Sequence, residues 1–262
     1  MIFAAGLGTR LKPLTDTMPK ALVRVGNQPL LWHVVMKLKA AGFERIVVNV
    51  HHFAQQIIDY LAANQRFGLD IRISDETGGL LETGGGIKKA RPLFSGDAPV
   101  LIHNVDILSN ADLTAFYDHA QEQQADALLM VSDRTTKRYL LFDDANVLRG
   151  WTNIETGELR PDSLRQEQFT HHPTPITHHP SPITYHPSPI TYYQKAFSGI
   201  HVLSPQLFPL MDAMPERFGI IDFYLNHCTD RRFVAYEQPG LQLLDVGKLD
   251  TLDAAEQFAL SC

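Results

Sequence analysis

The chain opens with MIFAAGLGTRLKPLTDTMPKAL over residues 1–22. Its first five residues are apolar enough for a buried strand, and they lead directly into a turn that contains Gly6 and Gly8. Glycine lets backbone N–H groups approach a ligand closely, so such a turn can surround phosphate oxygens. Arg10 adds a planar donor group that suits phosphate, and Lys20 adds a point charge. The stretch therefore predicts a strand followed by an anion-binding loop.

Two common glycine loops do not match this stretch. Leu11 stands where the third glycine of a dinucleotide-binding loop belongs, and no Gly-Lys-Ser/Thr follows as in a P-loop. A Gly-x-Gly pair alone would also fit an ordinary tight turn with solvated cations. The full run of 22 residues is far more specific than either fragment.

The first half of the chain alternates short apolar runs with helical patterns. Leu31, Val34, Val35 and Leu38 have the spacing of one helix face, with Pro29 before them and Gly42 after them. Strands are expected at 1–5, 46–50, 69–73, 100–103 and 127–131, and helices at 31–38, 54–61, 87–93 and 113–120. This alternation predicts an α/β fold, a Rossmann-like three-layer sandwich with a mostly parallel mixed sheet. In such sheets the ligand lies at the carboxyl ends of the strands.

The second half is less regular. Hairpin strands are expected within 138–160, further strands at 196–203, 233–236 and 241–244, and helices at 220–228 and 248–259. Residues 171–191 contain three copies of a seven-residue unit, HHPTPIT, HHPSPIT and YHPSPIT. Two prolines in each unit rule out a regular helix or an interior strand. We expect a surface loop here; a metal-binding or partner-binding arm is the alternative.

Composition limits the classes of function. The chain has 262 residues, 44% of them hydrophobic, and its net charge of −6 argues against broad nucleic-acid binding. Its two cysteines fit no zinc or disulfide pattern. We find neither an apolar run that could span a membrane nor a signal peptide, so a cytoplasmic protein is expected.

Three further segments carry candidate residues. Residues 82–86, Glu-Thr-Gly-Gly-Gly, could pack closely against a base or a sugar, or could form a plain helix start. Asp106 follows one apolar strand and Asp245 another, and each could be structural. Asp222 could bind a sugar or be an exposed helix charge.

Residues 1–22 closely resemble the signature of the sugar nucleotidyltransferase superfamily, a Gly-x-Gly-Thr-Arg turn followed by Pro, Thr and a Pro-Lys pair. The resemblance extends over nearly the whole chain apart from the repeats, and it implies a single nucleotidyltransferase domain over 1–262. It implies a nucleotide site at Ala5, Gly6, Gly8, Thr9 and Gly85, catalytic roles for Arg10 and Lys20, a sugar site at Glu82 and Thr83, and Mg²⁺ on Asp106 and Asp245. Asp222 is added as a candidate for the sugar site, with an exposed helix charge as the alternative. Two carboxylates with phosphate oxygens and waters suit the all-oxygen preference of Mg²⁺.

The resemblance also implies the substrates, a nucleoside triphosphate and a sugar 1-phosphate, and a monomer or small homo-oligomer. The LETGGGI and FSGIHV segments are most similar to N-acetylmuramate-1-phosphate uridylyltransferases of cell-wall recycling, which favours UTP. Mannose-1-phosphate guanylyltransferases, phosphocholine cytidylyltransferases and a catalytically silent regulator are the alternatives. Larger relatives hold the sugar phosphate with a lysine in a Glu-Lys-Pro segment. This chain has no clear equivalent, and Arg160 and Lys195 are both candidates.

Overall fold

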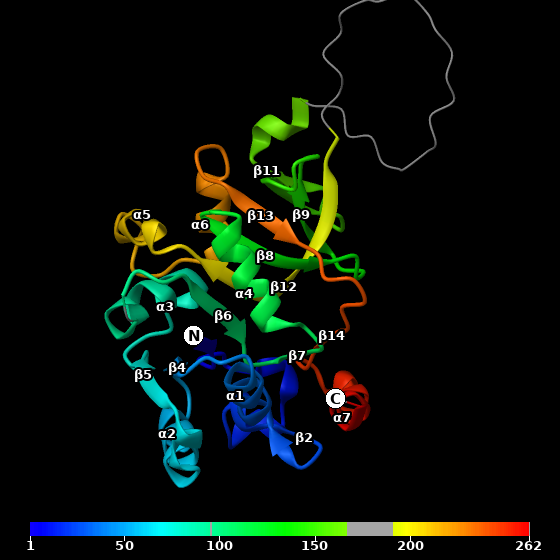
Figure 1. The fold of residues 1–262 in the computed structure, drawn as a ribbon. Helices are drawn as coiled ribbons and strands as arrows, with labels where there is room; N and C mark the ends of the chain where they lie inside the picture. The colour runs from blue at the N-terminus through cyan, green and yellow to red at the C-terminus, as the bar shows by residue number, and fades with distance from the viewer. Residues whose placement is uncertain (95, 167–190, 262) are drawn as a thin grey trace, which may run out of the picture.

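The computed structural model describes residues 1–94, 96–166 and 191–261. Within these ranges a ten-stranded sheet runs through the protein (Figure 1). Its main path is β11 (Glu158–Arg160), β10 (Leu148–Asn153), β9 (Arg138–Phe142), β12 (Tyr193–Leu203), β6 (Val100–Asn104), β1 (Ile2–Phe3), β4 (Arg45–Val50) and β5 (Asp70–Asp75). Strand β8 (Ala127–Ser132) pairs with β12 and with β13 (Phe233–Tyr236). Of the predicted repeats, residues 171–190 lie outside the described residues.

The sheet is mixed, and its parallel part lies where the sequence predicts it. Strands β6, β1, β4 and β5 are parallel neighbours, as are β8 and β13. The long strand β12 is antiparallel to β6, β8 and β9. The predicted α/β class with a mixed central sheet is confirmed.

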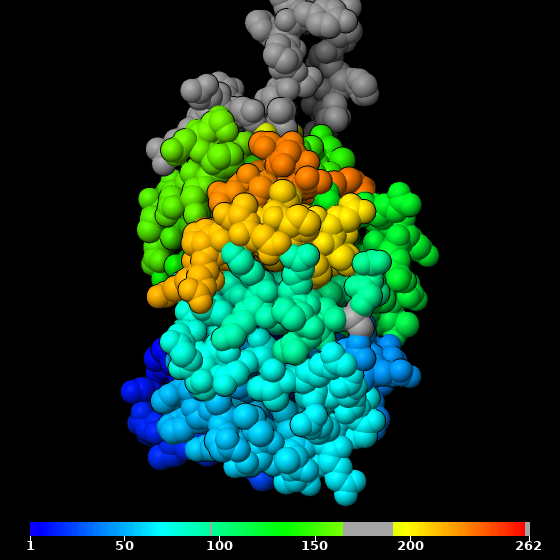
Figure 2. Space-filling model, turned by 90° about the vertical axis from the view of Figure 1, so that its left-hand side faces the viewer, coloured from blue at the N-terminus to red at the C-terminus, as the bar shows by residue number. Residues whose placement is uncertain are grey.

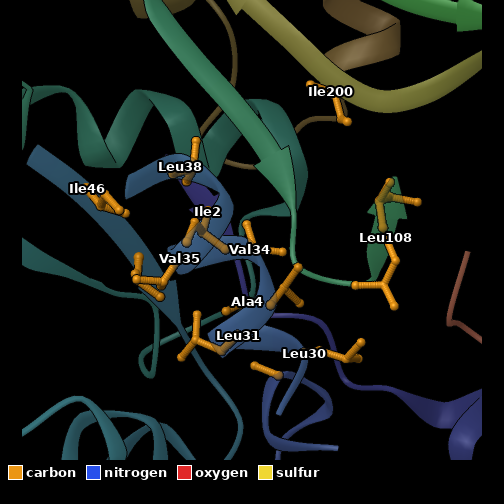
Figure 3. Close-up of a cluster of buried hydrophobic side chains, with 14 of the residues drawn as sticks. Ile2, Ala4, Leu30, Leu31, Val34, Val35, Leu38, Ile46, Leu108 and Ile200 are labelled. Carbon is orange, nitrogen blue, oxygen red and sulfur yellow. The ribbon is translucent and has the colours of Figure 1, made fainter. Parts of the chain in front are cut away.

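Helices cover both faces because alternate strand residues point in opposite directions. Leu101 of β6 belongs to one hydrophobic core and Ile102 to the other. The first core receives α1 (Leu30–Ala40), α2 (Ala54–Ala63), α4 (Leu113–Glu122) and α7 (Leu252–Ser261). Figure 3 shows its centre, where Leu31, Val34 and Leu38 of α1 lie over Ile2 of β1.

The second core lies under α3 (Glu82–Ala90), α5 (Phe208–Asp212) and α6 (Ile220–His227). Helix α3 contacts both α5 and α6, although the sequence separates them by more than 100 residues. Figure 2 shows this meeting of the two halves of the chain, with α3 in teal below the yellow and orange segment. None of the helices in the described ranges combines the length and apolar character needed to cross a bilayer.

The glycine run differs from the sequence-based expectation. A loop was expected up to a helix at 87–93, but α3 begins at Glu82 and takes in Gly84, Gly85 and Gly86. A short antiparallel pair that sequence reasoning only half foresaw also forms, between β7 (Ile107–Ser109) and β14 (Leu243–Asp245). A second pair joins β2 (Arg24–Val25) and β3 (Gln28–Pro29). Tertiary contacts of Gly84, Gly85 and Gly86 outweigh the poor helix propensity of glycine.

We predict that acid destabilises the fold through two buried histidines. Burial lowers the pKa of His103 on β6 to about 4 and that of His201 on β12 to about 3. In the unfolded chain both have a pKa near ~6.5, so the unfolded state binds more protons below that pH. Stability is therefore complete above pH ~6.5 and falls as the pH decreases, by ~2 kcal/mol per histidine between pH ~7.5 and ~5. Urea unfolding at these two pH values measures the loss.

His201→Gln is the variant that isolates one of these contributions. It should remove roughly half of the part of the acid loss that the two histidines cause. A variant with the same pH dependence of unfolding as the wild type would contradict the assignment to His201.

Candidate functional site

A cavity of about 240 Å³ opens at the carboxyl edge of the parallel strands. Phe3, Asn49 and Asn104, the register partners at the ends of β1, β4 and β6, line its floor. Six residues predicted from the sequence also line it: Ala5, Gly6, Lys20, Glu82, Thr83 and Asp106. The edge of the sheet that was expected to hold the ligand is the edge where the structure has this cavity.

The glycine turn is held by its own backbone and by Thr15. Gly8 has a φ of +63°, a left-handed conformation that favours glycine. Its carbonyl accepts hydrogen bonds from the backbone N–H of Leu11 at 2.8 Å and from the hydroxyl of Thr15 at 2.8 Å. Gly6 has no atom within 4 Å of the point where a Cβ would lie, so its surface faces open space. The turn therefore offers free backbone on the cavity side and is anchored on the other side.

Lys20 reaches the cavity as a largely buried cation. It begins a 3-10 turn (Lys20–Leu22), is 8% exposed, and its Nζ contacts Oδ2 of Asp106. Burial of either charge alone would be costly, so each one stabilises the other in this position. The contact joins the predicted catalytic lysine to one predicted metal ligand.

The pairing of β14 with β7 brings the segment of Asp245 next to that of Asp106, and Asp245 itself lies outside the cavity lining. Asp245 lies opposite Ile107 in the register, and the N–H of Val246 donates to the carbonyl of Asp106 at 2.8 Å. The Oδ1 atom of Asp245 is buried and has no hydrogen-bond partner among the described residues. A Cβ on Gly247 would lie 2.6 Å from that oxygen and 2.7 Å from Nη2 of Arg10.

This geometry fits a divalent cation held in part by the protein. An unpartnered carboxylate oxygen is the type of ligand that Mg²⁺ accepts, and the hydrogen bond from Val246 brings the backbone of Asp106 close to it. No group of three or more His, Cys, Asp or Glu side chains within the described ranges could hold a metal ion alone. Phosphate oxygens or waters would have to complete the coordination. Arg10 and Thr9 are exposed and lie outside the cavity lining.

The candidate sugar residues meet where α3 approaches α6. Glu82 forms an ion pair with Arg217 at 2.8 Å, and its φ of +62° is unusual for a residue other than glycine. A Cβ on Gly219 would lie 2.9 Å from Oδ2 of Asp222 and 3.7 Å from Oε2 of Glu82. The fold thus brings Glu82 and Asp222 to one wall around Gly219, although 140 residues separate them in the sequence and Asp222 does not line the cavity.

The first turns of α3 and α6 satisfy each other's hydrogen-bonding groups. The N–H groups of Gly84 and Gly85 donate to the carbonyl of Phe218, at 2.9 and 3.1 Å. In return the N–H of Ile220 donates to Oγ1 of Thr83 at 2.9 Å. Free N–H groups in the first turn of a helix need such acceptors. Among the described residues the Thr83 hydroxyl donates no hydrogen bond of its own.

The glycines of α3 are required by contact. A Cβ on Gly84 would lie 2.2 Å from the Phe218 ring, and one on Gly85 would lie 2.3 Å from the carbonyl oxygen of Glu216. Such distances leave no room for a side chain. Gly85, predicted to bind nucleotide, is buried and lies outside the cavity lining, so its placement indicates packing. Its nucleotide role stays a prediction.

The two candidate cations for the sugar phosphate differ in their surroundings. Burial alone would lower the pKa of Lys195, but hydrogen bonds to Asp133 at 2.7 Å and Glu237 at 2.8 Å outweigh it and raise that pKa. Arg160 instead donates to Asp222 at 2.9 Å, on the wall that carries Glu82. The structure therefore associates Arg160, and not Lys195, with the candidate sugar residues.

Sequence reasoning missed three residues of this region: Asn49, Glu76 and Arg217. Asn49 and Glu76 line the cavity and are 1% and 0% exposed. The available signal was a polar residue inside the apolar run IVVNV, which a buried strand does not need.

Comparison with known proteins identifies relatives of this chain. The family model for nucleotidyl transferase matches residues 1–139. N-acetylmuramate alpha-1-phosphate uridylyltransferase from Neisseria meningitidis serogroup B is 46% identical over 121 residues, which are 46% of this chain and 52% of that protein. The protein of the same name from Caulobacter vibrioides is 43% identical over 171 residues, 62% of this chain and 70% of the relative.

Solved structures extend the similarity of fold to the whole chain. A proposed glucose-1-phosphate thymidylyltransferase from Bacillus anthracis superposes with a TM-score of 0.75. The superposition covers 100% of this chain and 94% of that one, at 15% sequence identity. At this identity the likeness concerns the fold.

We predict that the two glycines of the turn respond differently to alanine. Gly8→Ala must keep a positive φ and place a Cβ 2.8 Å from Cγ2 of Thr15, so it should lower the free energy of unfolding by about 1–3 kcal/mol. Gly6→Ala meets no neighbour and should change it by less than about 0.5 kcal/mol. Urea unfolding of both variants measures the difference, and equal losses would contradict the anchored geometry of Gly8.

Proposed function

Because this chain belongs to the nucleotidyl transferase family, we propose that it transfers a nucleoside monophosphate from a nucleoside triphosphate to a sugar 1-phosphate. An oxygen of the sugar phosphate attacks the α-phosphorus, a new P–O bond forms, and the bond to the β-phosphate breaks to release pyrophosphate. The observation that carries this proposal is the Lys20–Asp106 contact in a cavity bounded by the glycine turn.

We propose UTP and N-acetylmuramate 1-phosphate as the substrates. Support comes from the two relatives at 43% and 46% identity, both named for that uridylyltransferase. The setting that this implies is cell-wall precursor synthesis in the cytoplasm. Mannose 1-phosphate with GTP is the alternative that the substrate test must separate.

Each residue of the site has a part in the proposed reaction. Backbone N–H groups from Gly6 to Thr9 bind the triphosphate, and the exposed Arg10 binds the departing phosphates. Lys20 lies inside the cavity, where it stabilises the negative charge that develops around the α-phosphate. Such a transfer depends on positioning and charge neutralisation and needs no covalent enzyme intermediate.

The two aspartates and the sugar wall complete the assignment. Asp106 and Asp245 would hold Mg²⁺, which when bound neutralises phosphate charge between the two substrates. Glu82, Thr83 and Asp222 would bind the sugar. Arg160 would bind its phosphate, in exchange for its contact with Asp222.

Loss of Lys20 should abolish most of the chemistry and leave the fold intact. We expect Lys20→Ala to lower kcat by about 10²–10³-fold, because a preorganised positive charge is lost. Lys12→Ala is the matched control: Lys12 belongs to the same loop but is exposed and pairs with Asp16. The assay is pyrophosphate release with UTP, GTP, CTP or dTTP against N-acetylmuramate, mannose or glucose 1-phosphate. Similar rates for the two variants would refute the role of Lys20.

Loss of the Asp245 carboxylate should weaken metal binding. We expect Asp245→Asn to raise the Mg²⁺ concentration for half-maximal rate about 10-fold or more, because one charged oxygen ligand is lost. Asp250→Asn, at an exposed carboxylate five residues further on, should leave that concentration unchanged. Mg²⁺ titration of the initial rate measures both variants. An unchanged midpoint for Asp245→Asn would exclude it as a ligand.

A further inference from the structure

The backbone needs a substitute partner where β1 leaves the sheet. Strand β1 ends at Phe3, and the next two N–H groups, of Ala4 and Ala5, have no strand left to pair with. Both donate to the same side-chain oxygen, Oδ1 of Asn49 at the end of β4, at 2.7 and 3.2 Å. One buried amide therefore determines how the chain enters the glycine turn.

The buried carboxylate of Glu76 accepts a hydrogen bond from the amide of Asn49. Oε1 of Glu76 accepts from Nδ2 of Asn49 at 2.7 Å, and its Oε2 accepts from the N–H of Leu81 at 3.3 Å. Glu76 is fully buried, and no basic side chain in the described ranges forms an ion pair with it. A carboxylate buried without a countercharge is costly, so its retention needs a reason.

The polarity of the pair supplies that reason. A carboxylate offers only acceptors, whereas an amide side chain has a donor end and an acceptor end. Facing Glu76, the amide of Asn49 must turn its donor end inward, which leaves Oδ1 toward the N–H groups of Ala4 and Ala5. A neutral amide at position 76 could satisfy either orientation of Asn49.

Helix α3 packs directly on this pair. A Cβ on Gly86 would lie 2.8 Å from Oε1 of Glu76 and 3.3 Å from Nδ2 of Asn49. The helix that carries Glu82 and Thr83 thus rests on the same two side chains that direct the glycine turn. The nucleotide side and the sugar side of the cavity share one buried support.

We propose that Asn49 and Glu76 are positioning residues that aim the free backbone N–H groups of the glycine turn at the triphosphate. This inference rests on the proposed nucleotidyl transfer. The N–H groups of Ala4 and Ala5 are already occupied, so within the part of the chain that the structure describes the first N–H groups open to phosphate are those from Gly6 onward. A flip of the Asn49 amide would place its Nδ2 donor against the N–H groups of Ala4 and Ala5, and this repulsion would displace the turn.

A polarity exchange tests the pair. Asn49→Asp puts two carboxylates side by side, and Glu76→Gln removes the group that orients Asn49. Each single variant should raise the Kd and the KM for UTP about 10-fold and leave the KM for the sugar phosphate within about twofold. The double variant N49D/E76Q keeps shape and total charge and again has one donor between the two side chains. The direction of that hydrogen bond is reversed relative to the wild type, because the new amide at 76 donates to the new carboxylate at 49. The double variant should return both UTP constants to within about threefold of wild type.

Hydrogen exchange of the Ala4 and Ala5 amides gives a readout that needs no ligand. Both should exchange slowly in the wild type and the double variant, and at least about 10-fold faster in Glu76→Gln. This measurement remains decisive if Asn49→Asp does not fold. Wild-type exchange and UTP affinity in Glu76→Gln, or a double variant no better than the worse single one, would overturn the proposal. A wild type that binds UTP but turns over no sugar phosphate would refute the proposed function, while exchange and UTP affinity still decide on the pair.

Discussion

The hydrogen bonds at the end of β1 are the constraint on which the rest of the site depends. This strand has only two residues and lies between β4 and β6, in the middle of the parallel part of the sheet. Buried N–H groups must find acceptors. The chain can leave the sheet here only because the side chain of Asn49 replaces the missing strand. The position of the glycine turn follows from that replacement.

Neither half of the chain forms the site alone. The family model matches the first half, which supplies the glycine turn, Lys20 and Asp106. The second half adds Asp245 through one short strand pair and the wall around Asp222 through the start of α6. The links between the halves are backbone hydrogen bonds, from Val246 to Asp106 and from the start of α3 to Phe218. Such links depend little on side-chain identity, so they can persist while the side chains around Asp222 change.

Sequence reasoning succeeded where periodicity or local chemistry carries the information. Helix α1 and strand β4 follow from spacing and apolar runs, and the glycine turn follows from its own residues. It failed for residues whose structural role depends on tertiary contacts. From the sequence Gly84 is expected in a loop, and only the contact with Phe218 explains why a helix contains it. Likewise, only the hydrogen bond to Glu76 explains the polar Asn49 within an apolar strand. The pairing of Asp106 with Asp245 required a family resemblance, since no local pattern connects residues 139 positions apart.

The inner face of α3 also restricts how this protein can change over evolutionary time. Three successive positions, Gly84 to Gly86, face a ring, a carbonyl oxygen and a carboxylate, the first two from residues 216–218 and the third from Glu76. A residue that already has no side chain cannot become smaller to accommodate a larger neighbour. Mutational drift around this helix is therefore one-directional: the surrounding residues can lose volume but cannot gain it. Lineages that diverge in sugar preference would have to do so through the outward-facing and rim positions.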